Sequence, residues 1–351
     1  MKVIITGICF FMNGLLFAQS LKNVLFIGNS YTQVNDLPGM VSTIASSLND
    51  SVYHESSTPG GYTLQMHSTN PGTLSKINSG NWQYVVIQAQ SQEPAMPPAQ
   101  VAANVYPYAD SLVKHVWEHD TCTRVLFYMT WGRKNGDAAN CPFYPVVCTY
   151  GGMQSRLRQS YLEMAQLFNK EVCPVGVAWK EVRETDSTIE LYNADESHPS
   201  LEGTYLAACT FYCSIFHKPV TGCYVPAGIS LPVANLLQVI AQSTVFDSLS
   251  TWNIDTSNIA CALNSMIETE QSKAEDRCSV WINAATGMLH VVSENDVNYI
   301  MTDQSGRLLQ PGALKAGETN INISNLQTGL YFFTVISKNK RISNFKFTII
   351  R

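Results

Sequence analysis

The sequence predicts an α/β domain followed by a small all-β domain. Apolar runs of strand length and segments with apolar residues at helical spacing alternate through most of the first 246 residues, whereas short β-rich segments separated by turn residues dominate from about residue 277. A chain of 351 residues with 45% hydrophobic and 14% charged residues can bury a large core. Alternating strands and helices indicate a parallel sheet covered on both faces, with right-handed crossovers.

Four segments define the predicted organisation. Residues 1–18 carry one positive charge, Lys2, then an apolar stretch that ends in Phe17 and Ala18, which is typical of a secretory signal peptide cleaved after Ala18. The stretch is too short to cross a bilayer comfortably. We predict a signal peptide at 1–18, an α/β domain at 19–246, a polar linker at 247–276 and an antiparallel β-sandwich at 277–351.

The overall charge bears on which partners are expected. Lys and Arg total 22 against 27 Asp and Glu, a net of −5, so nothing in the overall charge favours nucleic acid or anionic lipid. A neutral or weakly charged substrate fits this composition better. No metal site is expected, because Cys-x-x-Cys pairs are absent from the sequence and His115 with His119 lack a nearby third ligand. We therefore expect no cofactor.

Export would place the cysteines in an oxidising compartment. Of the ten cysteines, Cys9 falls within the signal peptide, and the nine that remain leave at least one thiol free. Partners cannot be derived from sequence, but Cys141 and Cys148 share one Pro-rich loop and are the first pair we predict.

The first predicted strand, Val24 to Ile27, consists of four apolar residues and ends at Gly28, where a glycine permits a sharp turn. Asp36, Leu37 and Pro38 then start a helix that runs to about Leu48. The later elements of the first domain are expected, in order, as strand 52–55, strand 82–90, helix 98–119, strand 124–131, a long loop at 132–151, helix 153–170, a strand within 172–182, helix 200–216 and helix 231–246.

Ser30 is the candidate nucleophile, because it follows the turn after a buried strand and so lies at the carboxyl edge of the sheet, where open α/β folds bind ligands. A serine hydroxyl needs a base within hydrogen-bond reach, and the base needs a group that holds its tautomer. His198 and Asp195 lie three residues apart in the loop before a helix and are the predicted base and acid. Acyl transfer also requires oxyanion donors, for which the Ser30 amide, an amide of Gly60-Gly61 and the Gln90 side chain are candidates.

These motifs resemble the SGNH or GDSL hydrolases over roughly residues 22–246. The motif Gly28-Asn29-Ser30-Tyr31-Thr32 resembles the family's first block, Gly61-Tyr62-Thr63 its second, and Asp195-Glu196-Ser197-His198-Pro199 its fifth. The resemblance implies a flavodoxin-like α/β/α fold with a five-stranded parallel sheet. It also implies an oxyanion hole formed by Ser30, Gly61 and a side-chain amide.

The third block departs from the family's pattern. The chain has Gln88-Ala89-Gln90-Ser91 where the family usually has Gly-x-Asn-Asp, so Gln90 is the predicted donor and Gln88 its substitute. The predicted substrate contacts are Asn29, Tyr31, Gln88 and Trp131.

The implied activity is that of a secreted serine esterase that acts on carboxylic esters. Glycan deacetylation is the favoured reaction because of surface display and the aromatic loop from Trp131 to Tyr150, while lipids or small esters fit the same catalytic residues. The rival hypothesis is a non-catalytic surface protein that binds carbohydrate on a hydrolase scaffold.

The C-terminal region resembles the sorting domain of the type IX secretion system, an export route of Bacteroidetes. The resemblance rests on the stretch from Asn325 to Val335, the basic segment Lys338 to Arg341, and the terminal residues 345–351. It implies that the secretion machinery is a partner and that the protein reaches the cell surface or the medium.

Overall fold

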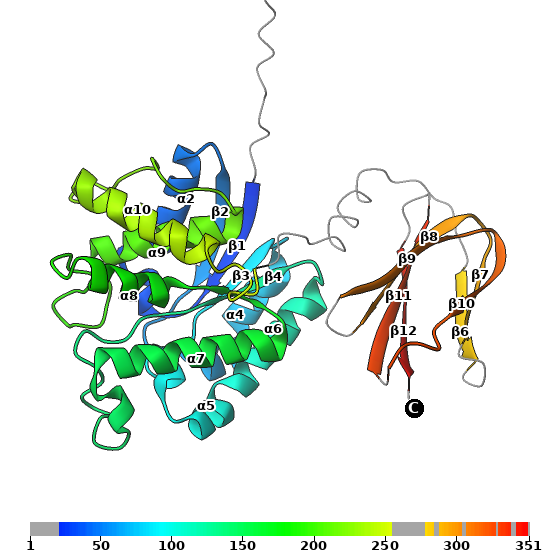
Figure 1. The fold of residues 1–351 in the computed structure, drawn as a ribbon, viewed down its shortest axis with the longest axis horizontal. Coiled ribbons are helices and arrows are strands. Elements are labelled where there is room, and N and C mark those ends of the chain that lie inside the picture. The colour runs from blue at the N-terminus through cyan, green and yellow to red at the C-terminus, as the bar shows by residue number, and fades with distance from the viewer. Residues whose placement is uncertain are drawn as a thin grey trace, which may run out of the picture. The chain divides into compact units, whose positions relative to one another are not determined.

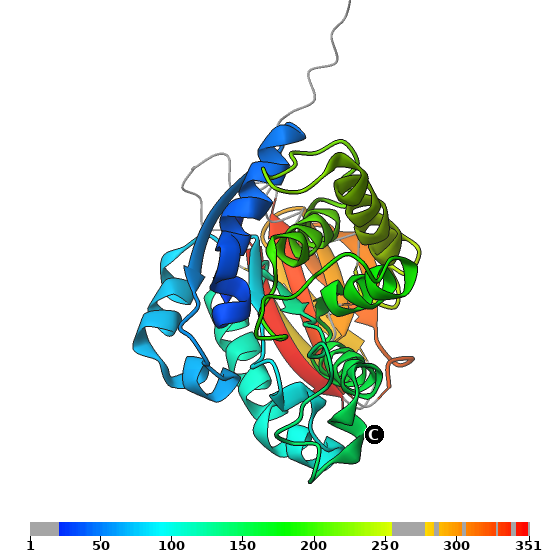
Figure 2. The same ribbon diagram turned by 90° about the vertical axis from the view of Figure 1, so that its left-hand side faces the viewer.

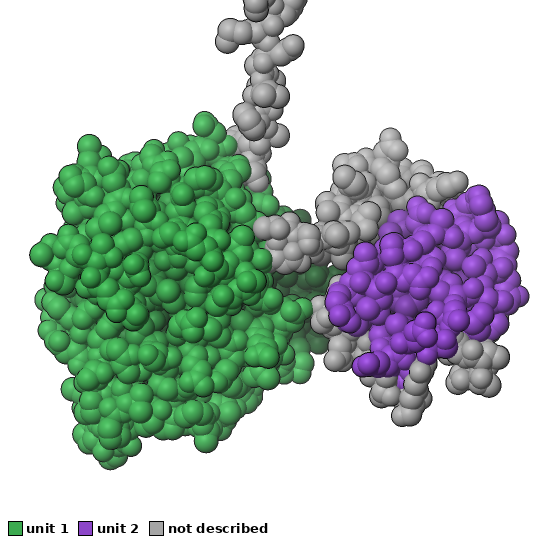
Figure 3. Space-filling model, in the orientation of Figure 1, with its two compact units in different colours: residues 1–255 green, residues 256–351 purple. Residues whose placement is uncertain are grey.

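The structure is a computed structural model and describes residues 21–254, 278–283, 288–303, 307–327, 329–337 and 342–349. The chain forms two compact units, residues 1–255 and 256–351, which Figure 3 shows in different colours. The predicted signal peptide, residues 1–18, lies outside the described residues.

A five-stranded sheet forms the centre of the first unit. Its strands are β1 (Leu21–Ile27), β2 (Ser51–Ser57), β3 (Tyr84–Ile87), β4 (Arg124–Tyr128) and β5 (Glu171–Cys173). All neighbouring strands are parallel, in the order β2-β1-β3-β4-β5. Apolar residues on both faces of β1 and β3 are fully buried, which explains their uninterrupted apolar runs. The predicted flavodoxin-like fold is therefore confirmed.

Helices cover both faces of this sheet (Figures 1 and 2). One layer consists of α2 (Leu37–Ser47), α8 (Val175–Thr185), α9 (Leu201–Phe216) and α10 (Leu231–Phe246). The other contains α3 (Leu64–Thr69), α4 (Pro71–Ser79), α5 (Pro98–Asn104), α6 (Tyr106–His119) and α7 (Tyr150–Phe168). The first unit therefore has three layers, α/β/α.

Some elements differ from the prediction. The expected helix 98–119 is divided into α5 and α6 at Val105, because Pro107 lacks the N–H that a continuous helix requires there. The expected strand within 172–182 is only β5, since Pro174 ends it and Val175 begins α8. Helices α3 and α4 were not predicted, and each is short and capped by a side chain, Thr63 for α3 and Asn70 for α4.

The first unit extends beyond the predicted boundary at residue 246. Trp252 is buried in the core, and its carbonyl accepts a hydrogen bond from the Val172 amide of β5 at 2.9 Å. Ile254 is buried as well. Residues 247–254, predicted as linker, are therefore part of the α/β unit, and the rest of the predicted linker, residues 255–276, lies outside the described residues.

The second unit is an antiparallel β-sandwich. One sheet has the order β10-β7-β6 and the other β12-β11-β8-β9. The strands are β6 (Cys278–Asn283), β7 (Met288–Ser293), β8 (Val297–Asp303), β9 (Leu308–Leu314), β10 (Gly317–Asn322), β11 (Gly329–Ser337) and β12 (Ile342–Ile349). Apolar side chains from both sheets, among them Leu289 and Phe333, form one buried cluster.

Strand β9 is not marked as a strand by its sequence, because it contains Pro311 and Gly312, which are typical of turns. A proline is tolerated here because β9 is the edge strand of its sheet.

The long loop between β4 and α7 contains the predicted disulfide. Cys141 and Cys148 are bonded, with Cα atoms 4.6 Å apart, so this prediction is confirmed. Four other cysteines, Cys173, Cys209, Cys213 and Cys223, are buried free thiols. Across the described parts of the chain, we find no helix with the length and apolarity needed to cross a membrane.

Candidate active site

Ser30, His198 and Asp195 meet at the carboxyl edge of the sheet. Ser30 begins the single-turn helix α1 (Ser30–Gln33) directly after β1, and its Oγ lies 2.8 Å from Nε2 of His198. The other ring nitrogen, Nδ1, is hydrogen-bonded to Oδ2 of Asp195. With the Nδ1 proton directed at the carboxylate, Nε2 is left to accept the serine proton. The geometry is that of a nucleophile, a base and an orienting acid.

A tight turn presents the acid and the base. The Asn193 amide donates to the His198 carbonyl at 2.8 Å, and Glu196 adopts a left-handed conformation with φ 60° at the tip. Oδ1 of Asp195 accepts the backbone amides of Ser197 at 3.1 Å and His198 at 3.0 Å. Partial burial alone would raise the pKa of the Asp195 carboxyl, but these hydrogen bonds and the one from the His198 ring hold its pKa below the usual range. Asp195 therefore stays ionised and holds the imidazole.

The nucleophile turn is held by Gln88, at the end of β3. Oε1 of Gln88 accepts the Asn29 amide at 2.9 Å and the Thr32 hydroxyl at 2.8 Å, while Nε2 donates to Oδ1 of Asn29 at 2.9 Å and to the Ala89 carbonyl at 2.7 Å. A Cβ on Gly28 would lie only 2.5 Å from Oε1 of Gln88. Glycine is thus required at position 28 because a larger residue would collide with the Gln88 side chain. We expected glycine there for a sharp turn, but its φ is not positive.

His67, in α3, also supports this turn and was not predicted to do so. Its side chain is fully buried; Nε2 lies 2.8 Å from the Gly28 carbonyl and Nδ1 lies 3.0 Å from Oγ1 of Thr73. Burial lowers the pKa of His67, so the ring is neutral, with Nε2–H donating to Gly28 and Nδ1 accepting from Thr73. No sequence signal marks this role, because it depends on a contact across 39 positions.

A stack of aromatic rings holds the segment directly before His198. Trp131, at the end of β4, is stacked between Tyr31 at 4.9 Å and Trp179 at 3.8 Å between ring centroids. Trp131 Nε1 donates to the Ser197 carbonyl at 3.0 Å, and the Tyr31 hydroxyl lies 2.6 Å from Oγ of Ser197. The stack therefore fixes the residue directly before His198.

The four predicted substrate contacts lie inside the protein. Asn29, Tyr31, Gln88 and Trp131 are each at most 2% exposed. Asn29 uses its side chain to accept the Tyr31 amide and to donate to the Tyr62 carbonyl. Because these side chains are enclosed and bonded to the protein, the structure gives them a positioning role in place of the predicted contact with substrate.

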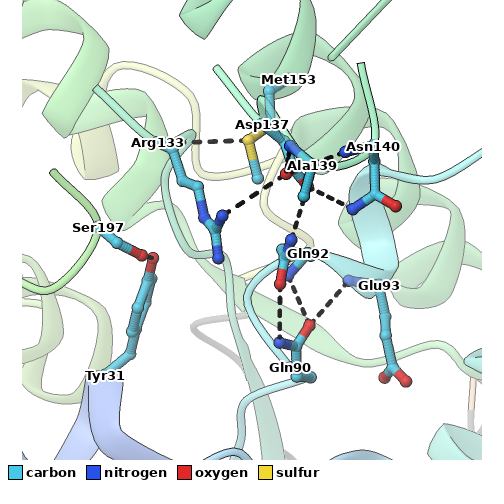
Figure 4. A network of polar contacts seen from close by, with 10 residues as sticks. All are labelled: Tyr31, Gln90, Gln92, Glu93, Arg133, Asp137, Ala139, Asn140, Met153 and Ser197. Atoms are coloured by element: carbon cyan, nitrogen blue, oxygen red, sulfur yellow. Dashed lines mark hydrogen bonds and ion pairs between the residues drawn. The ribbon is translucent and has the colours of Figure 1, made fainter. Parts of the chain in front are cut away.

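The candidate oxyanion donors Gly61 and Gln90 line one hollow of about 320 Å³. Gly61 has φ +72°, a conformation that favours glycine. Oε1 of Gln90 accepts the amides of Gln92 at 2.7 Å and Glu93 at 3.1 Å, which orients the side chain, while Nε2 has only a long contact of 3.4 Å with Gln92 (Figure 4). Gln90 therefore retains donor capacity, whereas both N–H groups of Gln88 are already used.

The hollow is mostly lined by uncharged polar groups. Glu93, in the 3₁₀ turn Glu93–Ala95, is the exception: Oε2 is buried with no partner among the described residues, and this burial raises the pKa of its carboxyl to about 7. The full lining is Gly61, Thr63, Gln90, Gln92, Glu93, Met96, Gln100 and Asn140.

Several solved structures are similar to parts of this chain. A DUF4886 family protein from Bacteroides uniformis is 19% identical, with 69% of this chain and 99% of that chain covered at a TM-score of 0.55. A putative SGNH hydrolase from Slackia heliotrinireducens is 24% identical, with 55% and 98% covered at a TM-score of 0.45. A variant of an acetyl xylan esterase from Geobacillus stearothermophilus is 15% identical, with 60% and 99% covered at a TM-score of 0.38. At these identities the likeness concerns the fold.

Residues 279–350 match the family described as the secretion system C-terminal sorting domain. The predicted sorting domain is therefore confirmed, and it implies export across the outer membrane. No curated protein matches the sequence.

Proposed function

We propose that the protein is a secreted serine esterase that removes acetyl or other small acyl groups from glycans through an acyl-enzyme on Ser30. The observation that carries the proposal is the 2.8 Å contact between Oγ of Ser30 and Nε2 of His198, together with the carboxylate of Asp195 on the opposite ring nitrogen. The hollow described above supports the proposal, because two of the candidate oxyanion donors, Gly61 and Gln90, line it.

In the acylation step, Oγ of Ser30 attacks the ester carbonyl carbon while its proton passes to Nε2 of His198. The negative charge that develops on the carbonyl oxygen requires preorganised donors, for which we propose the amides of Ser30 and Gly61 and Nε2 of Gln90. The tetrahedral intermediate then collapses, the C–O bond to the alcohol breaks, and the alcohol leaves with the proton from His198.

In the deacylation step, a water molecule gives one proton to Nε2 of His198 and attacks the acyl-Ser30 carbonyl. The bond between the acyl carbon and Oγ breaks, Oγ recovers the proton, and the free carboxylic acid departs. Asp195 stays ionised throughout and stabilises the imidazolium. No step in this cycle requires a metal or an organic cofactor.

The first experiment measures hydrolysis of 4-nitrophenyl acetate and of acetylated oligosaccharides by the wild-type chain and by Ser30→Ala and His198→Ala. Each variant should lose nearly all turnover at an unchanged thermal midpoint, and the double variant should be hardly worse than either single one, because the two residues act as a unit. A Ser30→Ala variant with wild-type rates would refute the mechanism. If the wild-type chain hydrolyses no ester but binds oligosaccharides, it is the carbohydrate-binding protein of the rival hypothesis.

The glycan is proposed because the sorting domain directs the protein to the cell surface or the medium. The acetylated-oligosaccharide series tests this point separately, since a lipase would prefer long acyl chains to acetyl groups on sugars.

A further inference from the structure

Arg133 stands beside the candidate active site, on the loop that follows β4. Figure 4 shows its side chain directed into the space between the Tyr31–Ser197 pair and the Gln90–Gln92 segment. The adjacent Lys134 amide donates to the Glu196 carbonyl at 2.9 Å, which ties this loop to the turn that carries Asp195 and His198. Burial raises the pKa of the Tyr31 phenol, and the hydrogen bonds with Ser197 and Ser91 and, less strongly, the charge of Arg133 oppose that rise.

The only charged partner of Arg133 among the described residues is Asp137, and their contact is long. Nη1 of Arg133 lies 3.5 Å from Oδ1 of Asp137, beyond good hydrogen-bond distance. The Asp137 carboxylate is fully buried, and its two oxygens already accept four hydrogen bonds, from Nε2 of Gln92, Nδ2 of Asn140 and the amides of Ala139 and Asn140. A carboxylate offers about four lone-pair positions, so Asp137 has little capacity left for the guanidinium.

The guanidinium of Arg133 therefore has N–H donors that Asp137 does not use, on a side chain that is partly exposed to solvent. The Arg133 side chain is 30% exposed, Nε is buried without a hydrogen-bond partner, and among the described residues the guanidinium has no charged contact closer than the 3.5 Å to Asp137. Glu93 is the carboxyl among the residues that line the hollow, and burial raises its pKa to about 7, so it is largely uncharged below pH 7 and repels an anion only weakly.

The backbone around Arg133 is rigidly held. The Arg133 amide donates to Sδ of Met153 at 3.3 Å, and the Gly132 amide donates to Oε1 of Gln154 at 2.8 Å. Farther along the loop, Gly136 has φ +85° and leaves no room for a Cβ against Cys148, whose disulfide closes the loop. These contacts fix the backbone from which the Arg133 side chain extends, and the planar fork of its guanidinium matches a carboxylate.

We propose that Arg133 is a specificity residue that binds a carboxylate carried by the ester substrate. The inference rests on the proposed esterase function and narrows its substrate class to acidic esters. It also departs from the neutral substrate that the net charge suggested, because a local guanidinium outweighs a diffuse net charge at short range. The carboxylate belongs either to the alcohol, as in an acetylated uronic acid, or to the acyl group, as in a half-ester of a dicarboxylic acid.

Two matched substrate pairs distinguish these sources. For the alcohol, the pair is an O-acetylated methyl galactopyranoside and the corresponding galactopyranosiduronate. For the acyl group, the pair is 4-nitrophenyl butyrate and 4-nitrophenyl hemisuccinate. The pair that shows a preference identifies the source of the carboxylate. In that pair, wild-type kcat/KM should be about ten- to a hundredfold higher for the acidic member, mainly through a lower KM, which is the effect expected of a charge-assisted hydrogen bond.

Arg133→Gln should reduce that preference to near one, and Arg133→Lys should retain part of it, because lysine keeps the charge but not the planar fork. Lys114→Gln is the matched control, since it removes one positive charge from an exposed site on α6. The proposal is overturned if the wild type treats both pairs alike, if Arg133→Gln lowers both members of a pair by the same factor, or if Lys114→Gln gives the same change.

A binding measurement separates this inference from the failure of the esterase proposal. Calorimetric titration of the wild-type chain with trigalacturonic acid, with a neutral galactotriose and with succinate requires no turnover. Tighter binding of an acidic ligand in the wild type, and its loss in Arg133→Gln but not in Lys114→Gln, would support the carboxylate site even if no ester were hydrolysed. Equal binding by all three proteins would overturn it.

Discussion

Replacement of Gln88 by alanine tests whether this residue, and not Gln90, holds the nucleophile turn. The change removes four buried hydrogen bonds that join Gln88 to Asn29, Thr32 and Ala89. It leaves the Asn29 amide and the Thr32 hydroxyl without their acceptor in a buried site. Each such donor costs about 1–3 kcal/mol, and the truncated side chain adds a cavity, so we expect a loss of about 3–5 kcal/mol in the free energy of unfolding.

Urea denaturation of Gln88→Ala and of wild type measures this loss, and the thermal midpoint should fall by on the order of 10 °C for a domain of this size. Gln65→Ala, an exposed glutamine on α3, is the control and should change stability by less than about 0.5 kcal/mol. Activity should fall as well, because Asn29 directly precedes Ser30. A destabilisation below about 1 kcal/mol would refute the reasoning, since it would mean that water or a relaxed backbone satisfies the orphaned donors.

Gln88→Glu separates the acceptor from the donor half of this network. The variant keeps an acceptor for Asn29 and Thr32 but places an oxygen against Oδ1 of Asn29 and the Ala89 carbonyl, which raises the pKa of the new carboxyl in the folded state. Stability should then be lost as pH rises from about 5 to 8, because the unfolded chain ionises this group more easily. A variant with the same pH dependence as wild type would show that the amide donor is unimportant.

Three further predictions address the site and the tail. Gln90→Ala should lower kcat by about a hundred- to a thousandfold with little change in KM or in the urea midpoint, the usual effect of removing one oxyanion donor, and unchanged kcat would exclude this role. Glu93→Gln should become more stable relative to wild type as pH rises from 5 to 8, because the raised pKa of Glu93 makes the wild-type fold lose stability between about pH 4.5 and 7. Urea denaturation midpoints of both proteins at pH 5 and pH 8 measure this difference. An equal difference at the two pH values would mean that Glu93 is well solvated in the native state. A chain that ends at residue 275 should keep esterase activity but fail to reach the surface or medium of its native host, and an inactive, folded fragment would make the tail part of the catalytic unit.

The sequence by itself determined the architecture and the three residues of the Ser30 site. The second half of β1, Val24 to Ile27, is apolar at every position because both of its faces are covered, and this apolar run is visible without any structure. Ser30 and His198 are 168 positions apart, yet each follows a local motif that places it at the same edge of the sheet. The disulfide between Cys141 and Cys148 was predictable because the two residues are close in sequence.

Only the tertiary structure decided which polar residues face a ligand and which support the site. Gln88 and Gln90 are two residues apart and alike in sequence, but one is enclosed by Asn29 and Thr32, while the other lines the hollow. The role of His67 likewise depends on a carbonyl 39 positions away. The availability of Arg133 depends on the four hydrogen bonds that already occupy Asp137. Whether a polar group is free to bind a ligand depends on how many of its donors and acceptors the protein already uses. Those partners come from distant segments that only the folded chain brings together.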